Sequence, residues 1–286
     1  MQAGALGVGL VLTAIGTAQA DDAAVARGGY LAAVAGCDRC HTDSKNSGAP
    51  YAGGRVLETE FGAIATPNIT PDRATGIGGW SRADFVRAMR WGIAPDGTHY
   101  VPAFPFPYFA ALTDDDLADL KAFLDSVPAV SRPRIPGAVS LALFARARAA
   151  VGAALSGEGM APPLPTQGPP ARGAYLAATV GRCGDCHTPL TWLGVPDLAR
   201  YLAGSHGGLE GRRAPNLTPD AKTGLGDWSE DDIASLLKDG GTPDGDFVGG
   251  AMAEIVRNTA RLTDGDRRAI AAYLKTLPPK VFGKNN

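Results

Sequence analysis

Two short stretches of this chain, CDRCH at Cys37–His41 and CGDCH at Cys183–His187, contain all four of its cysteines and two of its four histidines. In each stretch two thiols lie three positions apart, and an imidazole follows directly. Two thiols about one helical turn apart can form thioethers with the vinyl groups of a haem, and the next side chain can then ligate the iron. The sequence therefore predicts two covalently bound haem c groups. The predicted attachment residues are Cys37, Cys40, Cys183 and Cys186, and the predicted proximal iron ligands are His41 and His187.

Other uses of paired cysteines fit this pattern less well. A zinc site built from four cysteines requires the two pairs to converge, yet they lie 146 residues apart and each has its own histidine. A redox-active pair usually accompanies a βαβ pattern, which this sequence lacks. Structural disulfides suit an exported protein, but they give no reason for a histidine after both pairs.

A sequence repeat surrounds the two motifs. Residues 66–104 align without a gap with residues 214–252, and 16 of these 39 pairs are identical. The segments RGGYLA and LTDDDLADLKAFLDSVP of the first copy correspond to RGAYLA and LTDGDRRAIAAYLKTLP of the second. Each copy has about a hundred residues, the size of one domain. We therefore predict a first domain at residues 21–128, a linker at 129–171 and a second domain at 172–286.

Short helices joined by loops are the elements predicted to position the motifs. In residues 112–128, Thr113 can cap a helix with Asp116 three residues on, and apolar residues then recur at helical spacing. Residues 262–278 repeat this arrangement. Further helices are predicted before each cysteine pair, at residues 81–91 and 229–239, and at 139–155 in the linker. No alternating run is long enough to indicate a sheet.

The ligand opposite the histidine distinguishes the two copies. Methionine is a common sixth ligand in electron-transfer cytochromes c, where it raises the potential. Met252 follows a glycine-rich loop downstream of the second motif and is the predicted sixth ligand there, whereas Met160 lies in the linker. The counterpart of Met252 in the gapless alignment is Phe104, so the first site lacks this methionine.

The order of these motifs resembles a known family. C-x-x-C-H, PN-[IL]-TPD-x-x-TG-[IL]-G-x-W, a loop with the distal ligand and a closing LTD…LP helix are together similar to the dihaem and trihaem c-type cytochrome subunits of periplasmic dehydrogenases. Those subunits serve membrane-linked alcohol, gluconate and fructose dehydrogenases and molybdenum hydroxylases. The resemblance covers nearly all of residues 27–279. It implies an all-α fold with two tandem class I cytochrome c domains, joined by a linker with one helix.

Three arrangements stay open for the sixth ligand of the first haem, because the family's usual loop reads like YPAMPY and Phe104 departs from it. His99 lies five residues before Phe104 in the same loop and can give bis-histidine ligation. The iron can instead be five-coordinate or water-ligated beneath Phe104. Met89 is the third candidate, although its counterpart Leu237 favours a core position.

The resemblance implies a dihaem electron carrier that takes electrons from a partner dehydrogenase and passes them to a downstream acceptor, a cytochrome or an oxidase. No catalytic residue is predicted, so we expect an electron-transfer protein or dehydrogenase subunit rather than an enzyme. The alternative is a dihaem enzyme such as a peroxidase, which requires an open iron at the first site. The loop there offers only His99 as an acid or base to cleave an O–O bond.

Charge and the N-terminus indicate location. The formal net charge of −2 argues against nucleic acid as a partner, because binding to phosphates needs a basic face. Residues 1–20 carry no charge, contain an apolar run and end in Ala18-Gln19-Ala20, which is typical of a signal peptide. No later segment has the roughly 20 apolar residues of a membrane-spanning helix. We expect a periplasmic protein without a transmembrane span in the mature chain, which a partner can hold at a membrane.

Some other repeated residues allow either a haem role or a structural one. The asparagines and threonines of the two PN-x-T segments can donate to haem propionates or cap loop backbone. These residues are Asn68, Thr70, Asn216 and Thr218. Tyr30 and Tyr175 are expected to face a helix interface rather than a cofactor.

Overall fold

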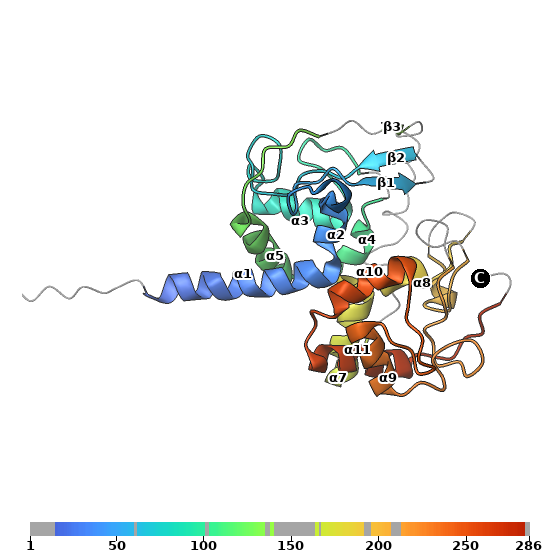
Figure 1. Cartoon of the computed structure of the whole chain (residues 1–286). Helices are drawn as coiled ribbons and strands as arrows, with labels where there is room; N and C mark the ends of the chain where they lie inside the picture. Colours follow the sequence, from blue (N-terminus) through green and yellow to red (C-terminus); the bar gives the residue numbers. More distant parts are fainter. Residues whose placement is uncertain are drawn as a thin grey trace, which may run out of the picture.

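The computed structural model of the chain describes residues 15–59, 62–100, 103–134, 138–139, 164–165, 167–191, 196–206 and 213–283. Figure 1 shows two groups of helices packed on one another, one from the N-terminal half (residues 15–139) and one from the C-terminal half (residues 164–283). Most of the predicted linker helix, most of the apolar run near the N-terminus and Met160 lie outside the described residues.

A similar series of helices occurs in each half. In the described residues of each half, a helix leads into a one-turn helix that carries the C-x-x-C-H motif, and a short 3-10 helix and three α-helices follow. In the N-terminal half the elements are α1 (Ile15–Ala35), α2 (Cys37–His41), η1 (Ser44–Asn46), β1 (Val56–Thr59), β2 (Gly62–Ala65), α3 (Arg82–Trp91), α4 (Phe106–Phe109), α5 (Asp114–Ser126) and β3 (Ala138–Val139). In the C-terminal half they are α7 (Gly168–Ala174), its π-helical continuation η2 (Tyr175–Val180), α8 (Cys183–His187), η3 (Leu198–Arg200), α9 (Glu230–Asp239), α10 (Gly250–Thr259) and α11 (Asp264–Thr276). The helices predicted at residues 81–91, 112–128, 229–239 and 262–278 are confirmed as α3, α5, α9 and α11.

Helix α1 has 21 residues, and its N-terminal part extends away from both helix groups (Figure 1). It includes Asp21, Asp22 and Arg27 within its length. Of the helices in the described part of the chain, none combines the length and the apolar character needed to cross a bilayer.

Capping residues fix the ends of the middle helices α3 and α9. The Ser81 hydroxyl accepts a hydrogen bond from the Asp84 N–H, and the Asp84 carboxylate accepts one from the Ser81 N–H. Ser229 and Asp232 form the same capping box at the start of α9. Both helices end at a glycine in the left-handed region, so the sequence sets both ends of each helix.

The first and last helices of each half cross where one of them has a glycine. At Gly28 of α1, a Cβ atom would lie 1.9 Å from the backbone oxygen of Asp119 in α5. At Gly173 of α7, a Cβ atom would lie 1.8 Å from the backbone oxygen of Ala269 in α11. Only glycine lets two backbones approach this closely. The repeated RGGYLA and RGAYLA segments therefore fix the same crossing in both halves.

A small antiparallel sheet in the N-terminal half departs from the predicted all-α fold. Strand β2 pairs with β1, with Val56 opposite Ala65, and with β3, where Val139 lies opposite Gly62. The strands have four, four and two residues, too few to give the alternating pattern by which a sequence reveals a strand. The prediction of a mostly helical fold is confirmed, but the small sheet was not predicted, and the start of the linker helix at Val139 was wrong.

Buried apolar side chains of the two halves form one continuous cluster. Helix α1 of the N-terminal half contacts α10 of the C-terminal half, and α4 of the N-terminal half contacts η2 of the C-terminal half. Helices α4 and α10 each follow the loop after the middle helix of their own half, so the same helix of each half packs on the other half. Leu31 and Val34 of α1 and Val180 of η2 are almost fully buried in this cluster. Short helices are marginal by themselves, and burial of an apolar face stabilises them. The junction between the halves is therefore part of what holds each half together.

Candidate haem-binding sites

The two C-x-x-C-H motifs fold as single helical turns, α2 and α8. Each follows a residue in the left-handed region, Gly36 with φ 68° and Arg182 with φ 53°, which separates the turn from the helix before it. Residues three apart lie on one side of a helix, so the two cysteines of a motif share a face. All four cysteines are half-buried and free of disulfide bonds. The structural disulfides considered above are therefore not formed.

The thiols lack the character of a redox-active pair. Burial raises the pKa of Cys37 to about 12 and the pKa of Cys183 to about 11. A catalytic C-x-x-C motif needs a lowered pKa, because the thiolate is the attacking species. Among the residues that the structure describes, no group of three or more histidine, cysteine or acidic side chains could hold a metal ion. The raised pKa of Cys37 and of Cys183 does not fit a dithiol oxidoreductase.

The histidine of each motif is anchored through one ring nitrogen. His41 Nδ1 lies 2.8 Å from the backbone oxygen of Pro67, and His187 Nδ1 lies 2.8 Å from the backbone oxygen of Pro215. A carbonyl can only accept, so Nδ1 carries the proton and Nε2 keeps a free lone pair. Burial lowers the pKa of both imidazoles, which favours the neutral form that binds a metal.

These four thiols and two anchored imidazoles fit covalent haem. Metal-ligating histidines almost always donate their other N–H to a carbonyl or carboxylate, which fixes the ring orientation. Pro67 and Pro215 supply this acceptor but were not predicted as site residues. The only sequence signal was their identity at equivalent places in the repeat, because a backbone oxygen has no residue-type signature.

The segment after each glycine-rich loop differs between the halves. Met252 was expected on a loop, but it lies in the first turn of the ten-residue helix α10. Phe104 lies in a turn ahead of α4, which has only four residues. Pro105 and Pro107 explain the difference, because proline disrupts a helix interior. The corresponding residues after Met252 are Ala253 and Ile255, both of which a helix interior accepts.

Phe104 takes part in an aromatic group where the other half has its methionine. Its ring lies edge-on to Tyr100, with centroids 5.7 Å apart, and tilted against Phe109 at 5.8 Å. It is half-buried and packs against the core cluster. Such pairs add stability beyond area burial, so Phe104 has a packing role whatever ligates the iron.

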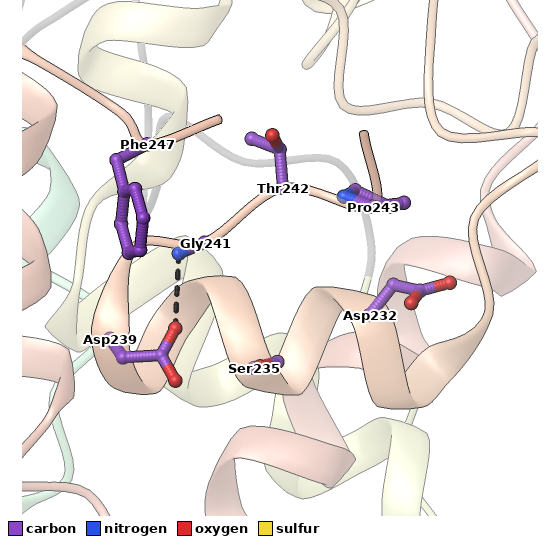
Figure 2. Close-up of a pocket in the computed structure, with 7 residues that line it drawn as sticks. All are labelled: Asp232, Ser235, Asp239, Gly241, Thr242, Pro243 and Phe247. Atoms are coloured by element: carbon purple, nitrogen blue, oxygen red, sulfur yellow. Dashed lines mark hydrogen bonds between the residues drawn. The ribbon is translucent and has the colours of Figure 1, made fainter. Parts of the chain in front are cut away.

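His99 is half-buried, and its Nδ1 is buried without a hydrogen-bond partner among the described residues. Its counterpart Phe247 has the same backbone pairing, since Ile93 pairs with His99 as Gly241 pairs with Phe247. Phe247 is 70% exposed and lines a groove of about 410 Å³ beside α9 (Figure 2). The same loop position therefore faces solvent in the C-terminal half and is partly enclosed in the N-terminal half.

Two other sets of candidates have structural partners. Met89 of α3 packs against the core cluster. The Asn68 side chain accepts from the backbone N–H and hydroxyl of Thr70 and donates to Thr75 and to the Val130 backbone oxygen. Asn216 and Thr218 make the matching bonds, with the Lys280 backbone oxygen as acceptor. These polar residues tie the loop to the chain after the last helix of each half.

Comparison with known proteins agrees with this geometry. The sequence profile of the cytochrome c family matches residues 170–278. The chain is 44% identical over 260 residues to the "diheme cytochrome c-type" protein of Cereibacter sphaeroides, a match that covers 88% of this chain and 85% of that protein.

Two dehydrogenase subunits are also similar. The chain is 38% identical to the cytochrome c subunit of the quinone alcohol dehydrogenase of Gluconobacter oxydans, over 98% of this chain and 61% of that subunit. It is 37% identical to the cytochrome c subunit of the gluconate 2-dehydrogenase of Pantoea cypripedii, over 95% of this chain and 63% of that subunit. The chain belongs to the c-type cytochrome family that includes these subunits, and whose cofactor is covalently attached haem c.

Proposed function

We propose that this protein is a periplasmic dihaem cytochrome c, organised as two tandem class I domains, that transfers electrons from a partner dehydrogenase to a downstream acceptor. The observation that carries the proposal is that the same set of haem-binding side chains occurs once in each half. Each half has two thiols on one helical turn and an imidazole whose Nδ1 lies 2.8 Å from a proline carbonyl. The names of the relatives, a dihaem cytochrome and two dehydrogenase subunits, support the same function.

Cys37, Cys40 and His41 would hold the first haem, and the equivalent residues of α8 would hold the second. The cytochrome c profile matches only within the C-terminal half, so the first haem rests on the geometry of the N-terminal half. Haem c, when bound, supplies a one-electron redox centre whose potential depends on its axial ligands. The part played by this chain is to fix the proximal imidazoles and to provide the sixth ligands.

We assign Met252 as the sixth ligand of the second haem and His99 as that of the first. Among the described residues the buried Nδ1 of His99 has no hydrogen-bond partner, and such a nitrogen is costly, which supports a role for His99 beyond packing. Met89 is assigned to the core, because it packs there. With both irons closed, the protein is an electron carrier and not a peroxidase.

Haem counting tests the number of sites. Purified protein should contain two haems per chain, and the double variants Cys37→Ser/Cys40→Ser and Cys183→Ser/Cys186→Ser should each contain one. A reductive titration should take up two electrons per chain, without steady consumption of hydrogen peroxide. One haem in the wild-type protein, or peroxide turnover, would contradict the proposal.

The electron-transfer partner is tested in the host bacterium. Membranes from a strain lacking this protein should lose oxygen uptake with one dehydrogenase substrate, such as an alcohol or gluconate. Purified wild-type protein should restore the uptake, and the Cys183→Ser/Cys186→Ser variant should not. Export is tested by locating the haem-stained protein in periplasmic extracts and reading its N-terminal residue, which we expect to be Asp21.

A further inference from the structure

Helix α10 of the C-terminal half is fixed against the haem attachment segment of the N-terminal half. A carboxylate oxygen of Glu254 lies 3.7 Å from a guanidinium nitrogen of Arg39 and 3.5 Å from one of Arg55. Arg39 belongs to the Cys37–His41 motif itself. We call these three residues the Glu254–arginine cluster. They join the cysteine motif of the N-terminal half to helix α10 of the C-terminal half.

Two further contacts lie along the same helix. Arg261, just after α10, is 3.7 Å from the carboxylate of Asp38. A Cβ atom at Gly36 would lie 2.9 Å from the Asn258 side chain, so α10 packs closely on the residue before the motif. Helix α10 therefore meets the Cys37–His41 segment and its neighbours at three places: at Glu254 in the middle of the helix, at Asn258 near its end and at Arg261 just beyond it.

The same helix carries Met252, two residues before Glu254. Residues two apart on an α-helix are rotated by about 200°, so they lie on opposite faces. With Glu254 held toward Arg39, Met252 lies on the face of α10 away from that segment. Any rotation or withdrawal of α10 would therefore move Met252 as well.

The Glu254–arginine cluster is well placed to hold a helix. The side chains of Arg39 and Arg55 are only 15% and 22% exposed, and that of Glu254 is 33% exposed. Arg55 also donates to the Arg39 backbone oxygen at 2.6 Å, so it binds the motif and the helix together. Partly buried charge pairs are screened by salt less than exposed pairs, but they are still screened.

In the N-terminal half, helix α4 occupies the place of α10, and it contacts the second cysteine motif through aromatic rings. The Arg182 guanidinium lies 5.3 Å from the ring centre of Phe109 in α4, and a Cβ atom at Gly184 would lie 3.3 Å from the Tyr108 ring. Helix α4 has no acidic residue. Of these two contacts between the halves, as far as the structure describes them, the one made by α10 includes ion pairs.

We propose that Glu254 is a positioning residue for Met252, and that its ion pairs with Arg39 and Arg55 let the N-terminal half set the axial ligation of the second haem. This inference rests on the proposed function, in which Met252 ligates that haem. Glu254 does not touch the iron; it acts by holding the helix that carries the ligand.

The test uses the full-length holoprotein and its Glu254→Gln variant. Two quantities are measured: the near-infrared methionine-to-iron charge-transfer band, and the midpoint potential of the second haem. Loss of methionine ligation lowers the potential, whereas removal of a nearby negative charge alone raises it. The two explanations therefore differ in sign. We expect Glu254→Gln to weaken the band and lower the potential, and Arg55→Gln to do the same to a smaller extent.

Added salt and two further variants test whether the effect on the band comes from the ion pairs of Glu254. In the wild-type protein, added NaCl should weaken the band, and in Glu254→Gln it should have no further effect. Glu254→Asp should keep most of the band, while Glu230→Gln, which removes an exposed charge from α9, should behave as wild type. A raised potential with an unchanged band in Glu254→Gln would overturn the positioning role.

Met252→Leu separates this inference from the proposed function. If the wild-type protein has the band and Met252→Leu lacks it, the ligand assignment stands and the Glu254 variants decide the positioning role. A band that persists in Met252→Leu would instead refute the ligand assignment, and the positioning role with it.

Discussion

The hydroxyl of Tyr30 accepts a hydrogen bond from the backbone N–H of Thr263 at 3.1 Å, although these two residues lie in different halves of the molecule. The same hydroxyl donates to the Asp266 carboxylate at 2.6 Å. Thr263 is the N-cap of α11, and its side chain accepts from the Asp266 N–H. In an ordinary capping box the acidic side chain bonds to the N-cap N–H directly. Here the Tyr30 hydroxyl, from the other half, bridges the Thr263 N–H and the Asp266 carboxylate.

Tyr175 makes the reciprocal contact at the start of α5. Its hydroxyl accepts from the Thr113 N–H at 3.3 Å and donates to the Asp116 carboxylate. The predicted pairing of Thr113 with Asp116 is thus confirmed for the hydroxyl, but the return bond passes through Tyr175. The expectation that both tyrosines face a helix interface is confirmed. Each half completes the cap of the other half's last helix.

Removal of either tyrosine hydroxyl should weaken the junction between the halves. Tyr30→Phe and Tyr175→Phe each remove the acceptor of an N-cap N–H and one hydrogen bond to a carboxylate, and each should lower the free energy of unfolding by about 1 kcal/mol. Guanidinium chloride unfolding followed by circular dichroism measures this. Tyr51→Phe is the control, because the Tyr51 ring packs on Phe123 and its hydroxyl has no hydrogen bond with the described residues. Equal losses in all three variants would contradict a capping role.

Acid should weaken the same junction through Asp266. Partial burial acts to raise the pKa of this carboxyl, but hydrogen bonds from Arg172 and Tyr30 hold the pKa below its ordinary value. A group with a lowered folded pKa adds stability above its unfolded pKa of about 3.9, and this stability is lost as the pH falls through the folded value.

The Asp266→Asn variant should therefore lose less stability than wild type between about pH 6 and about pH 3, and it should be the less stable protein at the higher pH. Urea unfolding at several pH values checks this. Asp115→Asn, at an exposed position on α5, serves as control and should keep the wild-type pH dependence. Parallel curves for wild type and Asp266→Asn would show that this carboxyl has no such role.

A methyl group at either helix crossing should be poorly tolerated. Gly28→Ala and Gly173→Ala place a Cβ atom within 2 Å of a backbone oxygen, so the helices must separate. We expect a loss of about 3 kcal/mol or more, together with low haem incorporation. Gly265→Ala, in the first turn of α11, meets only the Thr263 hydroxyl at 3.9 Å and should leave stability unchanged or slightly raised. Wild-type stability in Gly28→Ala would mean that the crossing is not as close as described.

The sixth ligand of the first haem can be read from the spin state of the iron. Low-temperature electron paramagnetic resonance of the ferric protein should show two low-spin signals. In His99→Ala one of them should become high-spin, since Phe104 offers no ligand. His206→Ala is the control, because His206 is exposed and stacks on Phe282. A high-spin signal already present in the wild-type protein would mean an open iron beneath Phe104.

Local signals made most helices predictable. Ser81 with Asp84 begins a helix through contacts within one turn, and the sequence contains both partners. Helix α10 was missed because a loop was inferred from the family resemblance, although Ala251, Ala253 and Glu254 favour helix by their intrinsic propensity. The short strands were missed because a hairpin of four-residue strands depends on pairing, which a sequence pattern of that length does not reveal.

The residues of the candidate site were likewise predictable where their signal is local, and not where it depends on distant segments. The thiols and imidazoles were predictable, because their chemistry is contained in five adjacent residues. The Pro67 carbonyl was not, since any residue can supply a backbone acceptor and this one lies 26 positions from His41. Contacts such as Glu254 with Arg39 join segments more than two hundred residues apart, and only the packing of the two halves brings them together.

The continuous buried cluster also means that the two halves share one interior. Removal of either half would expose side chains such as Leu31 and Val180 to water, so each half acts as part of the other's core. A different ligand residue in one half, such as Phe104 at the position that corresponds to Met252, leaves this shared interior in place.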